Sequence, residues 1–237
     1  MKLTGQIALV TGAGRGIGRA IARTLASEGA TLVLAARTVS ELDRVRDEIE
    51  AGGAKALVVR ADVTREKDVE KLFGEVRSRY DRLDILVNNA GIGRFVNVRD
   101  MNVDDFDAMW ALNMRGLFLC SQQAVKIMEP QKNGVIVNIS SLAGKNAFVG
   151  GAGYAATKWA LMGFSKCLML EERQFNIRVI TICPGSVDTT FSDQTSDPAR
   201  SDRIIAPQDV ADTVLSAVTI PARAMVSEID IRPTNPK

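Results

Sequence analysis

Short apolar runs and amphipathic stretches alternate regularly along this chain, and this alternation constrains its fold more than any other feature. Seven runs rich in Val, Ile and Leu lack strict polar–apolar alternation, as expected of strands covered on both faces of a parallel sheet. They span residues 7–11, 31–36, 56–61, 85–88, 135–140, 179–183 and 228–231. The stretches between them carry apolar residues near a period of 3.6, which predicts helices over residues 17–28, 41–51, 66–80, 104–128, 154–173 and 209–217.

The alternation predicts an α/β fold: a doubly wound parallel sheet of about seven strands, in a single domain over residues 1–237. The chain has 237 residues, of which 46% are hydrophobic, and this is enough to bury one sizeable core. In such a sheet, ligands bind at the carboxyl ends of the strands. A polar, turn-rich segment over residues 192–203 is predicted to be a mobile surface loop.

Charge and cysteine content exclude several classes of partner. The net charge is +2 and the basic residues are spread along the chain, so we expect neither nucleic acid nor a membrane surface as partner. The N-terminus carries no signal-peptide core, and no apolar run approaches the roughly 20 residues of a membrane span. Cys120, Cys167 and Cys183 lie in apolar stretches, which is typical of buried thiols in a reducing compartment. A cytoplasmic protein is therefore expected.

The chain contains no histidine. This excludes Ser-His-Asp and Cys-His catalytic groups, histidine-ligated zinc and imidazole bases, and no metal site is predicted. Any general acid or base must therefore be a different residue type.

A glycine-rich turn follows the first predicted strand. Its glycines are Gly12, Gly14, Gly16 and Gly18. They let the backbone bend sharply and approach a pyrophosphate, while the helix that begins near Ile17 offers unpaired N–H groups and the positive end of its dipole. This predicts a dinucleotide site, although the spacing departs from the general G-x-G-x-x-G fingerprint. A purely structural glycine turn is the alternative.

The end of the second predicted strand bears on the choice of cofactor. A free ribose 2′-hydroxyl is usually held there by a carboxylate, whereas a 2′-phosphate needs a cation. Here Arg37 follows the strand, and Arg15 stands in the glycine turn. Two guanidiniums can clamp a phosphate dianion, so NADP(H) is preferred over NAD(H). The alternative is that both arginines are solvated surface residues.

Tyr154 and Lys158 are the candidate proton-transfer pair. Residues four apart share one helical face, and an ammonium beside a phenol lowers the pKa of the phenol from about 10. A solvated surface pair is the alternative. Ser141 stands at the carboxyl end of the fifth predicted strand, where a hydroxyl can face a substrate carbonyl, and Asn113 interrupts an apolar helical stretch. Either residue could instead have a structural role.

In combination, these motifs resemble those of the short-chain dehydrogenase/reductase superfamily, in particular its single-domain 3-oxoacyl-ACP reductase-like and carbonyl reductase-like members. Residues 11–18 are similar to its glycine loop, residues 88–91 match its Asn-Asn-Ala-Gly motif, and residues 184–189 look like its proline-glycine turn. Asn113, Ser141, Tyr154 and Lys158 match its Asn-Ser-Tyr-Lys tetrad in order. The matches span about residues 5–190, which makes the combination far more specific than any single motif.

The resemblance implies a role for each matched residue. Tyr154 is the general acid in reduction and, as phenolate, the base in oxidation, while Lys158 lowers its pKa and holds the nicotinamide ribose. Ser141 hydrogen-bonds the substrate oxygen, and Asn113 anchors a water that links Lys158 to solvent. With Tyr154 and Lys158, the implied cofactor-binding residues are Gly12, Gly14, Arg15, Gly16, Ile17, Gly18, Arg37, Asp62, Val63, Asn89, Ala90, Gly91, Pro184, Gly185, Val187 and Thr189.

The expected activity is therefore hydride transfer between NADP(H) and a small-molecule carbonyl or alcohol substrate. The alternative is a non-catalytic dinucleotide-sensing or scaffold protein. The C-terminal region departs from the oxoacyl-reductase pattern, because residues 192–206 are short and residues 226–234 replace a glycine-rich strand and tail. This argues against acyl-carrier substrates. Leu142, Phe148, Val149 and Phe191 either line an apolar substrate pocket or belong to the core of their loops.

The predicted helices over residues 104–128 and 154–173 carry more apolar side chains than one face against a sheet requires. The resemblance implies that they meet the same helices of a second copy across an isologous two-fold interface. A homo-oligomer, either a dimer or a tetramer, is therefore expected. The alternative is that the surplus is deep core.

Overall fold

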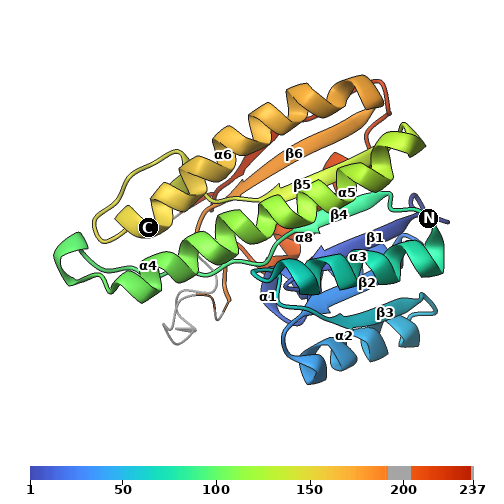
Figure 1. The fold of residues 1–237 in the computed structure, drawn as a ribbon, viewed down its shortest axis with the longest axis horizontal. Helices are drawn as coiled ribbons and strands as arrows, with labels where there is room; N and C mark the ends of the chain where they lie inside the picture. The colour runs from blue at the N-terminus through green and yellow to red at the C-terminus, as the bar shows by residue number, and fades with distance from the viewer. Residues whose placement is uncertain (190, 192–203, 236–237) are drawn as a thin grey trace.

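One parallel sheet forms the centre of the computed structural model, which describes residues 1–189, 191 and 204–235 (Figure 1). Its strands are β1 (Ile7–Thr11), β2 (Thr31–Ala36), β3 (Ala56–Arg60), β4 (Ile85–Asn88), β5 (Gly134–Ile139), β6 (Ile177–Pro184) and β7 (Glu228–Ile231). They lie in the order β3-β2-β1-β4-β5-β6-β7. The predicted doubly wound parallel sheet is confirmed, and the loop predicted over residues 192–203 lies outside the described residues.

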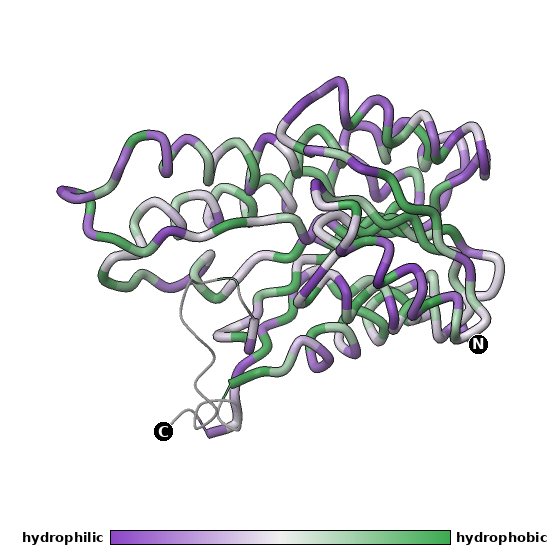
Figure 2. The backbone as a smooth tube through the Cα atoms, turned by 90° about the horizontal axis from the view of Figure 1, so that it is seen from below, coloured by the Kyte–Doolittle hydropathy of each residue, from purple (hydrophilic) through white to green (hydrophobic). Residues whose placement is uncertain are grey.

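Helices cover both faces of the sheet. They are α1 (Gly16–Ser27), α2 (Val39–Ala51), α3 (Glu66–Tyr80), α4 (Val103–Trp110), α5 (Leu117–Gln131), α6 (Ala152–Glu172) and α8 (Pro207–Val218). Apolar side chains of α1, α2 and α8 pack on one face, and those of α3, α5 and α6 pack on the other. Figure 2 shows the strands as a hydrophobic centre between helices whose outer turns are hydrophilic. Both faces of the strands are buried, which explains why their sequences lack alternation.

The winding of the sheet reverses between β1 and β4, which are hydrogen-bonded neighbours with Val10 opposite Val87. From this pair, the strands proceed through β2 to β3 on one side and through β5 and β6 to β7 on the other. Loops that leave the carboxyl ends of β1 and β4 therefore diverge, and ligands of doubly wound sheets bind in the crevice between such loops. The glycine turn follows β1 and Asn89 follows β4, so both lie at this crevice.

The sequence predicts one regular α-helix over residues 104–128, and this prediction is wrong. A π-helical segment, η2 (Ala111–Gly116), joins α4 to α5, and Asn113 lies within it. The backbone stays helical through the junction, so the apolar pattern of the sequence continues across it. The pattern therefore does not reveal the wider π-helical turn. Such π segments are frequent at functional sites.

The prediction of three buried thiols is correct for Cys120 and Cys183 and wrong for Cys167, which is exposed on α6. The apolar side chains of α6 continue onto the face turned away from the sheet, where Trp159 and Leu170 are 54% and 60% exposed. An apolar sequence neighbourhood is therefore a poor guide to burial on this helix. In the described part of the chain, no helix is long and apolar enough to cross a membrane.

Candidate active site

The glycine turn between β1 and α1 leaves space that a side chain would fill. Gly12 and Gly16 adopt left-handed backbone conformations, with φ of 64° and 53°. A Cβ on Gly18 would lie 2.2 Å from the Gly12 carbonyl oxygen, so only glycine allows α1 to approach the turn this closely. Arg15 is the N-cap residue of α1, and its side chain makes no capping hydrogen bond. The N-terminus of α1 therefore has the form of an anion site.

Asn89, at the end of β4, holds the glycine turn in place. Its Nδ2 donates to the carbonyl oxygens of Thr11 and Gly12 at 3.0 and 3.2 Å. The Thr11 hydroxyl in turn accepts from the backbone N–H groups of Asn89 and Ala90, both at 3.1 Å. These bonds connect the two diverging loops, so the Asn89 side chain positions the turn. Thr11 precedes the first glycine of the motif, but the glycine spacing alone predicts no role for its hydroxyl.

Arg15 and Arg37 are both exposed at the end of the sheet that carries the glycine turn. The turn reaches β2 through a hydrogen bond from the Ala13 N–H to the Ala35 carbonyl oxygen at 3.3 Å. A carboxylate also reaches this region, because a Cβ on Gly14 would lie 2.9 Å from Glu41 Oε2. Glu41 is in the first turn of α2 and has no place in the motifs that the sequence analysis used. The region thus combines two cations with one anion.

The other predicted cofactor-binding residues lie at the same edge of the sheet. Asp62 follows β3 and accepts two hydrogen bonds from Thr64, one from its N–H and one from its hydroxyl. Val63 is buried against Gly116 of η2, where a Cβ would meet Val63 Cγ2 at 3.0 Å. After β6, Thr189 lies against the glycine turn, since a Cβ on Gly16 would meet its Cγ2 at 3.3 Å. Tertiary structure therefore brings loops after β1, β3, β4 and β6 to one edge.

Asn113 is buried, and both polar atoms of its side chain are hydrogen-bonded to neighbouring residues. Its Oδ1 accepts from the Ile92 N–H at 2.9 Å, while its Nδ2 donates to the Ile92 carbonyl oxygen at 2.9 Å and to the Thr157 hydroxyl at 3.0 Å. The Thr157 hydroxyl donates to the Tyr154 carbonyl oxygen at 2.8 Å. Asn113 therefore ties the loop after β4 to the first turns of α6. Thr157, which links the two, was not predicted, because a threonine inside a helix gives no pattern of its own.

Ser141, Tyr154 and Lys158 lie close together, and Tyr154 and Lys158 are buried. The Ser141 hydroxyl is near enough to the Tyr154 phenol to lower its pKa. Lys158 Nζ lies 5.7 Å from the centroid of the Tyr154 ring and donates to the Ile139 carbonyl oxygen at 2.9 Å. Gly91 lies beside the same residues, since a Cβ there would lie 3.2 Å from Asn113 Oδ1 and 3.9 Å from Lys158 Nζ. The four residues of the predicted tetrad are thus brought together.

The pKa of Tyr154 is shifted in the direction opposite to the sequence prediction. Burial raises it to about 12, and the hydrogen bond with Ser141 opposes this rise. Burial lowers the pKa of Lys158 to about 8, against a smaller opposite effect of Cys183. The expected lowering by the ammonium is not found because the lysine donates to a backbone carbonyl and the phenol is desolvated. The Ser141 hydroxyl, and not the Lys158 amine, is the group that lowers the pKa of Tyr154.

A buried polar network links strands β4 and β5 to α5 and to α6, the helix that carries Tyr154 and Lys158. Asn88 Nδ2, on β4, donates to the Ser121 hydroxyl of α5 and to Asn138 Oδ1 of β5, at 3.0 and 2.9 Å. Asn138 Nδ2 donates to the Ser165 hydroxyl of α6 at 2.9 Å. Buried side-chain bonds of this kind favour one packing arrangement, although Asn88 Oδ1 finds no partner among the described residues. They therefore set the register of α5 and α6 against the strands.

A family model described as short chain dehydrogenase matches residues 6–200. The chain belongs to the short-chain dehydrogenase family. Sepiapterin reductase of Chlorobaculum tepidum is 36% identical over 236 residues, which cover 97% of this chain and 96% of the relative. A 3-oxoacyl-[acyl-carrier-protein] reductase of Synechocystis sp. is 37% identical over 231 residues, which cover 95% of this chain and 94% of the relative. The family resemblance inferred from the motifs is confirmed.

Solved structures of short-chain dehydrogenases share the whole fold. A metagenomic short-chain oxidoreductase in complex with NADP superposes with a TM-score of 0.88 at 39% identity, and the match covers 99% of both chains. A 7α-hydroxysteroid dehydrogenase complexed with NADH and 7-oxo glycochenodeoxycholic acid gives a TM-score of 0.91 at 31% identity, covering 98% of this chain and 95% of that one. This short-chain dehydrogenase is thus similar to proteins solved with either nicotinamide cofactor.

Proposed function

We propose that this short-chain dehydrogenase transfers a hydride between NADP(H) and an apolar carbonyl or alcohol substrate, with Tyr154 as the proton donor in reduction. The observation that carries the proposal is the juxtaposition of the Ser141 hydroxyl and the Lys158 amine with the buried Tyr154 side chain. A phenol and a hydroxyl that lie this close can both face a single substrate oxygen. The serine would orient that oxygen, and the phenol would protonate it.

The glycine turn fits a dinucleotide cofactor. The space at Gly12 and Gly18 that a Cβ would fill allows close approach of a pyrophosphate, and the N-terminus of α1 supplies N–H donors. The residues that would hold the cofactor are those matched by the family motifs, with Lys158 at the nicotinamide ribose. When bound, the nicotinamide supplies or accepts the hydride. Tyr154 and the side chains around it would bind and orient the substrate and transfer the proton.

Tyr154 is protonated at neutral pH, because its pKa lies near 12. This state is suitable for a general acid, and it favours carbonyl reduction over alcohol oxidation at neutral pH. In the oxidative direction the same residue must first become a phenolate. Lys158, whose amine is 5.7 Å from the ring centroid, would stabilise that negative charge when protonated.

The preference for NADP(H) rests on Arg15 and Arg37, whose exposed guanidiniums can pair with a 2′-phosphate. Glu41 opposes it, because a carboxylate next to Gly14 repels a phosphate and can accept from a ribose hydroxyl. Two positive charges against one negative charge favour the phosphate. A relative solved with NADP agrees with this preference, while one solved with NADH shows that the fold accepts both.

Aromatic side chains surround Tyr154 and support an apolar substrate. The rings of Phe95 and Phe191 meet the Tyr154 ring edge to face, with centroids 5.3 and 5.8 Å away, and Phe148 lies 5.8 Å from Phe95. Phe148 and Val149 are 46% and 91% exposed, so they are not loop core. They line an open cavity of about 260 Å³ formed by residues 96–98, 147–152 and 155, which Tyr154 itself does not line. A relative that was solved with a 7-oxo bile acid also binds a large, mainly apolar carbonyl compound.

A non-catalytic dinucleotide sensor is the alternative function. Such a protein needs the glycine turn but has no use for a tyrosine, a serine and a lysine grouped as Tyr154, Ser141 and Lys158 are. Assays of NADPH oxidation with a panel of ketones and aldehydes distinguish the two functions. We expect turnover with at least one apolar carbonyl compound, whereas tight NADPH binding without turnover of any of them would favour the sensor.

A homo-oligomer is supported by apolar side chains that the single chain leaves exposed. Leu117, Leu161, Met162 and Leu168 are buried within the chain, so part of the apolar surplus is core. Phe118 on α5 and Trp159 and Leu170 on α6 are 43%, 54% and 60% exposed. We propose that these helices pair with the same helices of a second copy. The cytoplasmic location remains a prediction from the cysteine content.

A further inference from the structure

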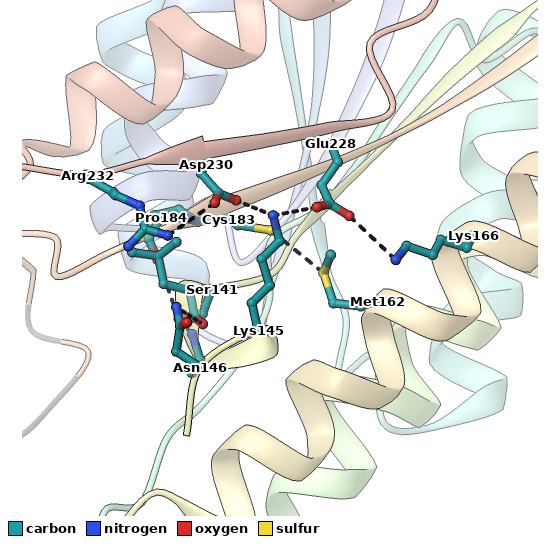
Figure 3. Close-up of polar contacts among 12 residues, drawn as sticks. Ser141, Lys145, Asn146, Met162, Lys166, Cys183, Pro184, Glu228, Asp230 and Arg232 are labelled. Carbon is teal, nitrogen blue, oxygen red and sulfur yellow. Dashed lines mark hydrogen bonds and ion pairs between the residues drawn. The ribbon is translucent and has the colours of Figure 1, made fainter. Parts of the chain in front are cut away.

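Lys145 joins the loop that carries Ser141 to the C-terminal strand (Figure 3). It ends the short 3₁₀ turn η3 (Leu142–Gly144), which begins directly after Ser141. Its Nζ contacts Glu228 Oε1 and Asp230 Oδ1, two carboxylates on the same face of β7. Figure 3 shows the amine between the two acids, with Arg232 on the far side of Asp230 and Lys166 on the far side of Glu228.

The ion pairs of Lys145 are partly buried. The side chains of Lys145, Glu228 and Asp230 are 27%, 29% and 31% exposed. The acids outweigh the desolvation of the amine and raise the pKa of Lys145 to about 12, while the pKa of Asp230 is lowered chiefly by its hydrogen bond to Lys145. Both partners therefore stay charged over the whole neutral range. A screened pair of exposed side chains would constrain the loop much less.

The same strand also holds the turn on the other side of Ser141. Ile231 of β7 accepts a hydrogen bond from the Gly185 N–H at 2.9 Å, and Pro184 pairs with Ile231 in the sheet. The Ser141 hydroxyl lies 3.4 Å from the Pro184 carbonyl oxygen. Leu142 fills the space beside Gly185, where a Cβ would meet its Cδ1 at 3.3 Å. β7 therefore contacts both segments that determine where the Ser141 hydroxyl lies.

We propose that Lys145 is a positioning residue, which uses its ion pairs with Glu228 and Asp230 to hold the Ser141 loop against β7. The C-terminal strand thereby fixes the distance between the Ser141 hydroxyl and Tyr154. β7 is a four-residue edge strand that hydrogen-bonds only to β6 in the described sheet, so it needs such a side-chain link to act as an anchor. The inference rests on the proposed function only for its effect on turnover.

Chain topology explains why the link must be made by side chains. Lys145 and Asp230 are 85 residues apart in sequence: Lys145 follows β5, whereas Asp230 lies in β7, which β6 separates from β5 in the sheet. η3 itself is held by local bonds, such as Gly144 N–H to the Ser141 carbonyl oxygen at 2.9 Å. These local bonds fix the shape of the turn. Among the residues that the structure describes, Lys145 alone ties the far end of η3 to the last strand by an ion pair.

The test compares Lys145→Met with Lys145→Arg and with Lys166→Met. For Lys145→Met we expect kcat to fall by about 10-fold to 100-fold, since small displacements of a catalytic group have effects of this size. The dissociation constant of NADPH should stay within about twofold, because the glycine turn is untouched. Lys145→Arg keeps a cation that can bridge both acids and should restore most of kcat. Lys166 contacts only Glu228, at 3.9 Å, and is 69% exposed, so Lys166→Met should leave kcat unchanged.

Hydrogen exchange followed by mass spectrometry gives a readout that does not depend on turnover. Lys145→Met should accelerate exchange in residues 140–146 and 226–233 and leave the glycine turn unaffected. A folded Lys145→Met variant with kcat within about twofold of wild type, or with unchanged exchange in these two segments, overturns the proposal. If this variant does not fold, Asp230→Asn, which retains the contact with Glu228, is measured in the same way and decides by the same criteria. Absence of wild-type turnover would contradict the proposed function, and exchange would still decide the role of Lys145.

Discussion

Lys158 Nζ donates to the Ile139 carbonyl oxygen at 2.9 Å, although the sequence places this lysine one helical turn after Tyr154. The amine is therefore held between α6 and the end of β5, in a pocket that shields it from water. Burial lowers its pKa to about 8 and raises that of Tyr154 to about 12. At neutral pH both groups carry their protons, which is the state required to protonate a substrate oxygen.

Replacement of Tyr154 by phenylalanine should abolish turnover and leave cofactor affinity nearly unchanged. The change removes only the hydroxyl that delivers the proton, and the loss of a positioned general acid lowers the rate by at least about 100-fold. Steady-state kinetics and NADPH titration of Tyr154→Phe measure the two effects. A variant that keeps a tenth of wild-type activity would contradict the assignment.

The pKa of Lys158 predicts a pH dependence of stability that Lys158→Met should lose. Below about pH 8 the folded protein carries the buried charge. Between pH 8 and the usual lysine pKa of about 10.5, the folded state has released this proton while the unfolded state still binds it, so the free energy of unfolding rises with pH. The shift corresponds to about 3 kcal/mol.

Denaturant titrations of both proteins without cofactor, from pH 7 to pH 10, measure this effect. We expect wild type to gain stability relative to Lys158→Met as the pH rises. Parallel curves over this range would show that the lysine is not desolvated. Lys158→Met should also impair both turnover and cofactor binding, since the amine is assigned to both.

Arg37→Asp should weaken NADPH binding much more than NADH binding, because a like charge replaces a partner of the 2′-phosphate. Glu41→Gln is the matched variant of opposite sign, since it removes the carboxylate beside Gly14 and should strengthen NADPH binding. Dissociation constants for both cofactors test the pair. A wild type that already prefers NADH would refute the phosphate clamp.

Thr157→Val should destabilise the protein, whereas Thr157→Ser should not. The Thr157 hydroxyl accepts from Asn113 Nδ2 and donates to the Tyr154 carbonyl oxygen, and the residue is fully buried. Valine has nearly the same shape but leaves these polar groups without their partner, at a cost of about 1–3 kcal/mol. Chemical unfolding of both variants provides the measurement. Equal stability of the valine and serine variants would show that the hydroxyl has no such role.

Light scattering at micromolar concentration tests the proposed interface between copies. A mass of about two or four times 25.6 kDa is expected, because Phe118, Trp159 and Leu170 are too exposed for an isolated chain. A mass near that of one chain would refute the interface. Trp159→Glu should shift the protein toward the monomer, while Val98→Glu, at a more exposed apolar residue outside α5 and α6, should not.

The strands and most of the helices follow from the sequence alone, and so does the choice of Asn113, Ser141, Tyr154 and Lys158 as the candidate tetrad. Apolar runs and 3.6-residue periods are set within a few neighbouring residues, so the bounds of β1, β2, β4, β7 and α3 agree with the prediction. The glycine turn is equally local, because it depends on backbone conformations that glycine adopts readily. The strand ends then bring Ser141 and the residues of the glycine motif to one edge of a parallel sheet.

The pKa values of the site residues, and the contacts that hold these residues in place, depend on the tertiary structure. The raised pKa of Tyr154 and the lowered pKa of Lys158 come from burial by distant segments, which no spacing between the two residues reveals. The bonds of Asn113 to Ile92 and Thr157, and those of Lys145 to β7, join segments that are far apart in the chain. The π turn at Asn113 also leaves the apolar pattern intact. A local sequence pattern predicts helices and strands. The burial of a side chain and its contacts with distant segments depend on how those helices and strands pack together.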